Sequence, residues 1–291
     1  MNFVKNRKIV FLISALIILA GVVSFIFQGF NWDIDFIGGK EMTYDIGVTA
    51  TREVQEKIEA AIENELGVEV STIMNAGQTE VVIRTKTITD EEEAKIRDYI
   101  ATNYKSENVE NVVVSTREIS ESVGGELRRD AIVATFVAIA LMLVYIAIRF
   151  EIRSGLTAVI GLCHDVLIML AAYTILQIPI NTSFIAAILT IIGYSINAAI
   201  IVLDRVRANK KLLAAGNEEI VNISIKQCLT RTINTTITTL FTIGMVCILG
   251  VTSIKEFTGP LIVGIVSGLY SSIFLTGPVW ELLSKNVKKR K

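Results

Sequence analysis

The sequence IGYSINAAIIVLDRVR, residues 192–207, decides the class of fold. Most of it is as apolar as a membrane span, yet Ser195 and Asn197 lie in its middle. Polar side chains are costly in hydrocarbon, so at this depth they indicate either a helix contact or a hydrated path. Asp204 and Arg205 end the stretch, where a solvated helix end is the favoured interpretation.

The composition extends this prediction to most of the chain. Of 291 residues, 52% are hydrophobic, and a soluble domain is rarely so apolar. A hydrocarbon core about 30 Å thick needs roughly 20 apolar residues in a helix. Six stretches meet or approach that length: Ile9–Phe27, Ala131–Ile148, Leu156–Ile178, Phe184–Leu203, Thr232–Val251 and Leu261–Leu283.

The basic residues of the short links predict the orientation. With six spans, four basic regions fall on one side of the membrane, which puts both termini in the cytoplasm. These regions are Lys5 to Lys8, Arg149 to Arg153, Arg205 to Arg231 and the tail NVKKRK. The QGFNWDID that follows the first span lacks an A-x-A cleavage site, so this span is interpreted as an uncleaved anchor rather than a signal peptide.

The chain therefore divides into three parts. Residues 1–28 form the cytoplasmic N-terminus and first span, 29–127 an extracytoplasmic domain, and 128–291 the other five spans with the basic tail. From Asp33 to Glu121 there are 20 acidic and 9 basic residues, a net charge of −11. This charge argues against binding to nucleic acid or to anionic lipid head groups, although acidity also simply keeps an exposed domain soluble.

Hydrophobic periodicity predicts the fold of the outer domain. Its segments read in the order β-α-β-β-α-β, which is typical of a ferredoxin-like α+β fold. Gly67 stands where a helix C-cap glycine belongs, and Thr89 with Glu92 forms a capping box before the second helix. The six segments are KEMTYDI, TREVQEKIEAAIENELG, VEVSTIMN, TEVVIRTK, EEEAKIRDYIATNY and NVVVSTREI.

Chemistry-bearing side chains are scarce in this domain. It contains no His and no Cys, and we find neither a nucleophile with a base nor a set of metal ligands, so we expect no enzyme, cofactor or metal site. A surface that touches polypeptide fits better. The three cysteines, Cys163, Cys228 and Cys247, imply no disulfide framework and are interpreted as small core residues.

The third span holds the only histidine of the chain, His164, beside Asp165. The pair is either a structural polar contact to a neighbouring helix or a proton or ion relay, because histidine titrates near neutrality and a buried carboxyl group can approach that range. Arg231 at the start of the fifth span either snorkels to the cytoplasmic surface or pairs with a carboxylate of the third or fourth span. The threonines that follow it either bond to their own helix or line a hydrated path.

Several motifs in a fixed order resemble the SecF subunits of the bacterial Sec protein-export machinery. They are DIDFIGGKEM, SVGGELRRDAI, YIAIRFEIRSGLTAVIGLCHDV, IGYSINAAIIVLDRVR and LTRTINTTITTL, and together they cover almost the whole chain. SecD looks similar in its spans but has a larger outer domain and a different motif in its fourth span.

The resemblance implies a role and a set of partners. A SecF subunit pairs with SecD as a 12-span unit of the RND superfamily and associates with the SecYEG channel. There it uses the proton-motive force, or sodium in some relatives, to help draw exported unfolded polypeptide across the bilayer after SecA has pushed it. Each elementary charge that crosses 100 mV supplies about 2.3 kcal/mol for such work.

The sequence departs from the family in its fourth span. The family pattern GYS-x-N-D places an aspartate where this chain has Ala198. Either the carboxylate of SecD suffices, or Asp165 carries more of the relay, or coupling is weak or altered. Arg231 matches the family's membrane arginine. The ion-coupling candidates are Asp165, His164, Arg231, Asn197, Ser195 and Asp204. An RND-type exporter half and a structural subunit without ion coupling are the alternative functions.

Overall fold

The computed structural model describes residues 2–104, 112–250 and 252–285. Within these residues it contains six helical segments long and apolar enough to cross a membrane, which confirms a multi-pass membrane protein. The first five are α1 (Arg7–Gln28), α5 (Glu121–Arg149), α6 (Ile152–Leu176), α7 (Thr182–Leu212) and α8 (Asn217–Leu249). The basic tail, residues 286–291, lies outside the described residues.

The sixth segment is a composite helix. It runs through α9 (Thr252–Tyr270), a π-helix η1 (Ser271–Thr276) and α10 (Gly277–Lys285). Pro260 lies inside α9, where it removes one intrahelical hydrogen bond. The sixth helical segment therefore begins before the predicted span from Leu261 to Leu283. It also contains two irregularities, Pro260 and the π-helix, which the hydropathy of the sequence does not indicate.

The helices of the basic link extend further than predicted. The sequence suggested a link from Arg205 to Arg231, but α7 continues to Leu212 and α8 begins at Asn217. Most of these basic residues are therefore helical, and the turn between the two helices is short. The Asn209 side chain on α7 donates to the Oγ of Ser224 on α8 at 2.8 Å, which joins the two extensions.

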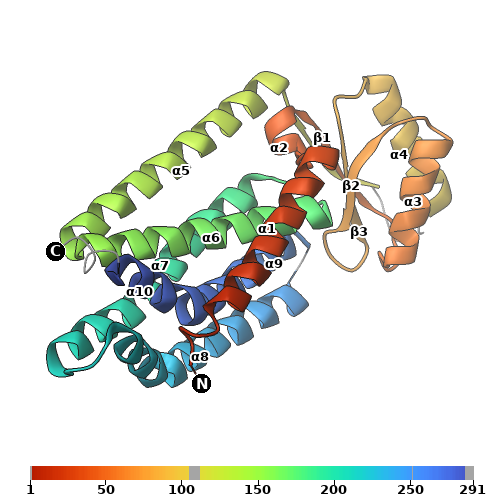
Figure 1. The fold of residues 1–291 in the computed structure, drawn as a ribbon. Helices are drawn as coiled ribbons and strands as arrows, with labels where there is room; N and C mark the ends of the chain where they lie inside the picture. Colours follow the sequence, from red (N-terminus) through yellow and green to blue (C-terminus); the bar gives the residue numbers. More distant parts are fainter. Residues whose placement is uncertain (1, 105–111, 251, 286–291) are drawn as a thin grey trace.

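Burial divides the helices into a centre and a periphery. Helices α6, α7 and α9 bury much of their surface against one another, whereas α5 and α8 leave most of theirs exposed. Figure 1 shows α5 standing apart from the other helices along much of its length. Gly21 lets α1 approach α6 closely, because a Cβ atom there would lie 2.5 Å from the Cα atom of Ala171.

A four-stranded antiparallel sheet lies at one end of the helices, with α3 and α4 beside it (Figure 1). Its strands follow the order β2-β3-β1-β4, and Met42 of β1 stands opposite Ile83 of β3. The elements are α2 (Ile34–Ile37), β1 (Gly39–Asp45), α3 (Arg52–Asn64), β2 (Val70–Asn75), β3 (Glu80–Thr85), α4 (Asp90–Tyr104) and β4 (Val113–Ile119).

Local sequence signals explain this unit. Met42 and Tyr44 alternate along one face of β1 and are buried, as their spacing predicts, and Ile46 directly after the strand is buried as well. They pack in one core with apolar residues of α3 and α4. The capping box is present, because the backbone N–H of Thr89 donates to Glu92 Oε2 at 2.8 Å and the backbone N–H of Glu92 donates to Thr89 Oγ1 at 3.3 Å.

Candidate functional site

A buried carboxylate lies at the centre of the helices. Asp165 on α6 is fully buried and accepts hydrogen bonds from three other helical segments. The hydroxyl groups of Ser195 on α7 and Ser271 on η1 donate to Oδ2, the latter at 2.7 Å. Ser267 on α9 donates to Oδ1 at 2.6 Å. Four parts of the chain thus meet at one carboxyl group.

His164 completes this cluster. Its Nδ1 lies 3.0 Å from Asp165 Oδ1, and its Nε2 lies 2.9 Å from the Oγ of Ser14 on α1. The imidazole therefore connects Asp165 to α1, and the two ring nitrogens are both engaged. We call Asp165, His164, Ser14, Ser195, Ser267 and Ser271 the Asp165 cluster.

Small side chains make this convergence possible. Gly268 faces the cluster, since a Cβ atom there would lie 3.8 Å from Asp165 Oδ2. Ser267 at the end of α9 and Ser271 at the start of η1 are four residues apart and therefore lie on one face of the composite helix. The π-helix begins at Ser271, and π-helical turns are frequent at functional sites.

The chemistry of the Asp165 cluster suits one exchangeable cation. A buried carboxylate is expensive unless its oxygens are hydrogen-bonded, and here four groups approach them. Serine hydroxyls can rotate and act as donors or as acceptors. The cluster can therefore adapt to Asp165 with or without a bound proton. Throughout residues 2–104, 112–250 and 252–285, no three His, Cys, Asp or Glu side chains form a metal-binding group.

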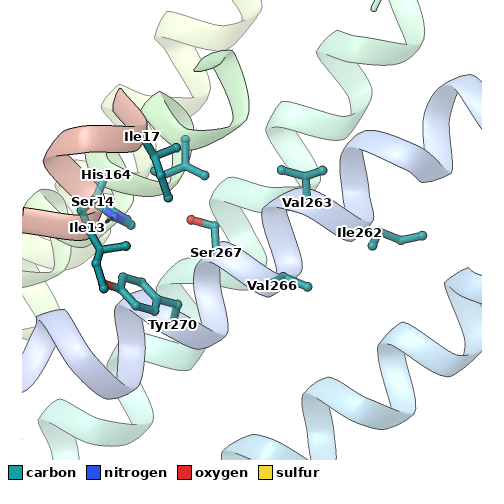
Figure 2. Close-up of a pocket in the computed structure, with 10 residues that line it drawn as sticks. Ile13, Ser14, Ile17, His164, Ile262, Val263, Val266, Ser267 and Tyr270 are labelled. Atoms are coloured by element: carbon teal, nitrogen blue, oxygen red, sulfur yellow. Dashed lines mark hydrogen bonds between the residues drawn. The ribbon is translucent and has the colours of Figure 1, made fainter. Parts of the chain in front are cut away.

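An apolar cavity borders the cluster. It has a volume of about 440 Å³ and lies between α1, α6 and α9. Figure 2 shows Ser14 and His164 on one side of it, with Ser267 and Tyr270 of α9 facing them. Its remaining walls are aliphatic, for example Ile17. Aliphatic side chains thus lie next to His164 on the side that faces the cavity, where the local dielectric constant is low.

Three of the six predicted residues meet at this site, namely Asp165, His164 and Ser195. Asn197 is exposed and lies in a shallow hollow between α5 and α7 with Tyr145. Asp204 lies apart from the cluster, eight residues before the end of α7, and is half-exposed, with a carboxylate oxygen 3.7 Å from Arg149 Nη2. The side chain is partly exposed, as a solvated position requires, but α7 continues to Leu212, so the expectation that Asp204 ends the helix is wrong.

Arg231 is also separate from the Asp165 cluster. Its side chain is exposed on α8, and no ion pair involves it within the part of the chain that the structure describes. The neighbouring threonines bond to their own helix, as one interpretation expected. Thr235 Oγ1 donates to the Arg231 carbonyl and Thr238 Oγ1 to the Asn234 carbonyl, at 2.9 and 3.1 Å.

Ala198, where the family pattern has aspartate, is buried on α7 three residues after Ser195. Residues at this spacing lie on neighbouring positions of one helix surface. The carboxylate that the pattern would supply is thus absent from the same side of α7 that reaches Asp165.

Sequence reasoning missed three members of the cluster, Ser14, Ser267 and Ser271. Serine is unremarkable in a membrane span, because its hydroxyl can bond to its own helix. One signal was available, since Ser267 and Ser271 share the face that carries Gly264 and Gly268. The same face also makes a helix contact, because a Cβ atom on Gly264 would collide with the side chain of Ile191 on α7.

Comparison with known proteins identifies clear relatives. Residues 99–286 match the family model described as "Protein export membrane protein SecD/SecF, C-terminal". The chain is 35% identical to "Protein translocase subunit SecF" of Haemophilus influenzae, over 94% of this chain and 83% of that relative. It is 34% identical to "Protein translocase subunit SecDF" of Bacillus subtilis, over 96% of this chain and 37% of that relative.

A solved structure has the same fold. The crystal structure of SecDF from Thermus, described as a translocon-associated membrane protein, superimposes with a TM-score of 0.81 and 31% sequence identity. The alignment covers 100% of this chain but 39% of that longer chain.

Proposed function

Because the chain belongs to the SecD/SecF family of protein-export membrane proteins, we propose that it is an accessory subunit of the Sec protein-translocation machinery. Its relatives are named as translocase subunits, which supports a transport role rather than an enzymatic one. The observation that carries the mechanism is the fully buried Asp165, which has four hydrogen-bonding partners at the centre of the helices. In this role the subunit converts ion movement through the membrane into movement of its outer domain.

Asp165 is the ion-coupling group in this proposal. A carboxylate in a span is a functional candidate because of its cost in hydrocarbon. Proton binding and release at Asp165 would change which hydroxyls donate to it, and so would alter the contacts of α7 and α9 with α6. Ala198 supports this assignment, since the carboxylate of the family pattern is missing from α7. The gradient is the proton-motive force or a sodium gradient.

The subunit works beside a second half, a SecD subunit. Fused relatives named SecDF are nearly three times the length that this chain covers, which leaves room for such a half. The exposed face of α8 supports the pairing as well. Arg231 and Asn234 are three residues apart on this face and are both exposed, and polar side chains of this kind are unfavourable against lipid. A partner helix with a carboxylate would suit them.

The outer unit, within residues 29–127, is a ferredoxin-like domain in this proposal. Its element order and its antiparallel sheet order β2-β3-β1-β4 support that assignment. We place it outside the cytoplasmic membrane of a bacterial cell, with residues 1–28 and 128–291 forming the membrane part and both termini in the cytoplasm. The basic residues near the opposite ends of the helices support this orientation. The domain would contact the exported unfolded chain as it leaves SecYEG, after SecA has driven its entry.

Depletion of the protein tests the function directly. Secretory precursors should then remain uncleaved in the cytoplasm, and their export should slow in pulse-chase labelling. Export kinetics that are identical with and without the protein would contradict the proposal. A defect in drug efflux with normal export would instead indicate an RND-type exporter half.

Reconstitution tests the coupling separately. Vesicles that hold this chain, a SecD partner, SecYEG and SecA should export faster when a proton or sodium gradient is imposed. Export that is stimulated by the subunit but is indifferent to both gradients would indicate a structural subunit without ion coupling.

A further inference from the structure

The outer sheet and the membrane helices are joined by an ion pair. Arg84 of β3 approaches Glu256 of α9, with Nη1 3.3 Å from Oε1, although the two residues are 172 positions apart. Both side chains are largely buried, with 11% and 16% of their surfaces exposed. The pair is thus shielded from salt more than a surface pair is.

Each member of this pair has other partners. Arg84 also binds Asp33, which precedes α2, and Glu41 of β1, each at 2.7 Å. Glu256 also accepts a hydrogen bond of 2.8 Å from the side chain of Asn181, at the start of α7. If Arg84 and Glu256 separate, the guanidinium keeps two carboxylates and the glutamate keeps its amide donor. Separation therefore leaves each charged group with at least one hydrogen-bonding partner, which lowers the cost of breaking the pair.

The charge balance around Arg84 also favours separation. Three carboxylates, those of Asp33, Glu41 and Glu256, share one guanidinium. Burial raises the pKa of Asp33, whereas the charge of Arg84 acts against that rise. The Glu256 contact is the longest of the three, and Coulomb attraction weakens with distance.

The position of Glu256 connects the Arg84–Glu256 contact to the Asp165 cluster through helix α9. It lies on the same helix, α9, as Ser267 of the Asp165 cluster, and Ser271 follows directly after that helix. Ser271 follows Glu256 by fifteen positions, which corresponds to about 22 Å along a helix. Pro260 between them gives α9 a point at which to bend.

We propose that the Arg84–Glu256 contact is a releasable latch that holds the outer sheet against α9. In the closed state described here the sheet is fixed to the membrane core, and in the open state it pivots on its covalent links to α1 and α5. The link from the latch to ion movement at Asp165 rests on the proposed function, but the latch itself does not.

Spin labels on the complete chain test the latch. With the three native cysteines replaced by alanine, one label is placed at Glu63 on α3 and one at Leu176 at the end of α6, both exposed positions. Double electron–electron resonance then measures the distance between the outer unit and the core. No translocation is needed, so failure of the proposed function would not affect this measurement.

The informative variant is Glu256→Gln, which keeps the shape of the side chain and its acceptor for Asn181 but removes the charge. We expect the population at displaced distances to rise roughly fivefold relative to the parent. The matched control is Glu69→Gln, which removes a carboxylate from an exposed pair with Lys86 within the outer unit, at 2.7 Å. This control should leave the distribution unchanged.

A distribution for Glu256→Gln that coincides with those of the parent and the control would overturn the proposal. If Glu256→Gln fails to fold, Glu256→Asp withdraws the carboxylate by one methylene group and should displace the distribution in the same direction. An unchanged distribution in that folded variant would overturn the proposal equally.

Discussion

The hydroxyl oxygen of Ser271 lies 2.7 Å from Oδ2 of Asp165, although 106 positions separate the two residues in the sequence. This contact joins the turn after α9 to the centre of α6. Ser195 donates to the same oxygen from α7, so a single carboxylate oxygen holds three helical segments together. A change in the charge of Asp165 must therefore alter hydrogen bonds that involve α7 and the α9–η1 junction.

Asp165→Asn should abolish the gradient-stimulated part of export while leaving basal export in place. The asparagine amide cannot bind and release a proton. Its NH₂ group would also face hydroxyl groups that, in the parent protein, donate hydrogen bonds to the carboxylate oxygens of Asp165. Export into vesicles with and without an imposed gradient measures both parts. Asp204→Asn is the control, because Asp204 is half-exposed and remote from the cluster, and it should retain stimulation. Stimulation that persists in Asp165→Asn would remove Asp165 from the mechanism.

Ser271→Ala should destabilise the protein by about 1.5–3 kcal/mol, the usual worth of a hydrogen bond to a charged group. The neighbouring variant Ser272→Ala is a close control, since Ser272 is equally buried but donates to the Leu269 carbonyl of its own helix, at 3.0 Å. Its loss should cost less. Thermal unfolding of both variants in mild detergent makes the comparison, and equal melting temperatures would count against a charged Asp165 in the cluster.

Arg231→Met should lower the export rate roughly 30-fold or more, because loss of one member of a desolvated charge pair costs about 2–5 kcal/mol. The predicted pair forms with the partner half, so co-purification with SecD should weaken as well. Lys226→Met provides the control on the same helix, at an exposed position five residues earlier. Wild-type export and wild-type co-purification by Arg231→Met would exclude this face of α8 as the contact.

Gly21→Ala should destabilise the packing of α1 on α6 by about 1–3 kcal/mol. The added methyl group would meet the backbone of Ala171 at 2.5 Å, and backbone cannot move aside as a side-chain tip can. Gly193→Ala adds the same group to α7 with no neighbouring heavy atom within 4 Å, so it should be neutral or slightly stabilising. Melting temperatures in detergent, with Asp165 intact in both variants, would reveal the difference.

The sequence alone predicts what depends on neighbours along the chain. The Thr89–Glu92 capping box and the alternation of Met42 with Tyr44 need only a few residues to act, and both are present. Asp165 and His164 were identified because a carboxyl group and an imidazole are costly in a span. In contrast, Ser271 and Glu256 have partners more than 100 positions away in the sequence. No pattern among their sequence neighbours marks either residue as part of a buried contact.

The exposed positions of Asn197 and Arg231 follow from helix rotation, which apolar composition does not specify. All faces of a membrane helix are largely apolar, so the hydrophobic pattern that orients a soluble helix is weak here. The close approach of α1 and α6 at Gly21 and the π-helix η1 likewise depend on how neighbouring helices pack against one another.

The π-helix at Ser271–Thr276 has a consequence for the end of the chain. A π-turn closes its rings over five residues rather than four, so it holds a residue in excess of an ordinary helix. Each residue turns an α-helix by about 100°. This surplus residue sets the angular phase of α10, and it thereby aims Glu281 at Arg7, whose Nη1 lies 2.7 Å from Oε2. Removing one residue from η1 would rotate that carboxylate away from the N-terminal segment, so the winding of six residues decides whether the Arg7–Glu281 ion pair can form.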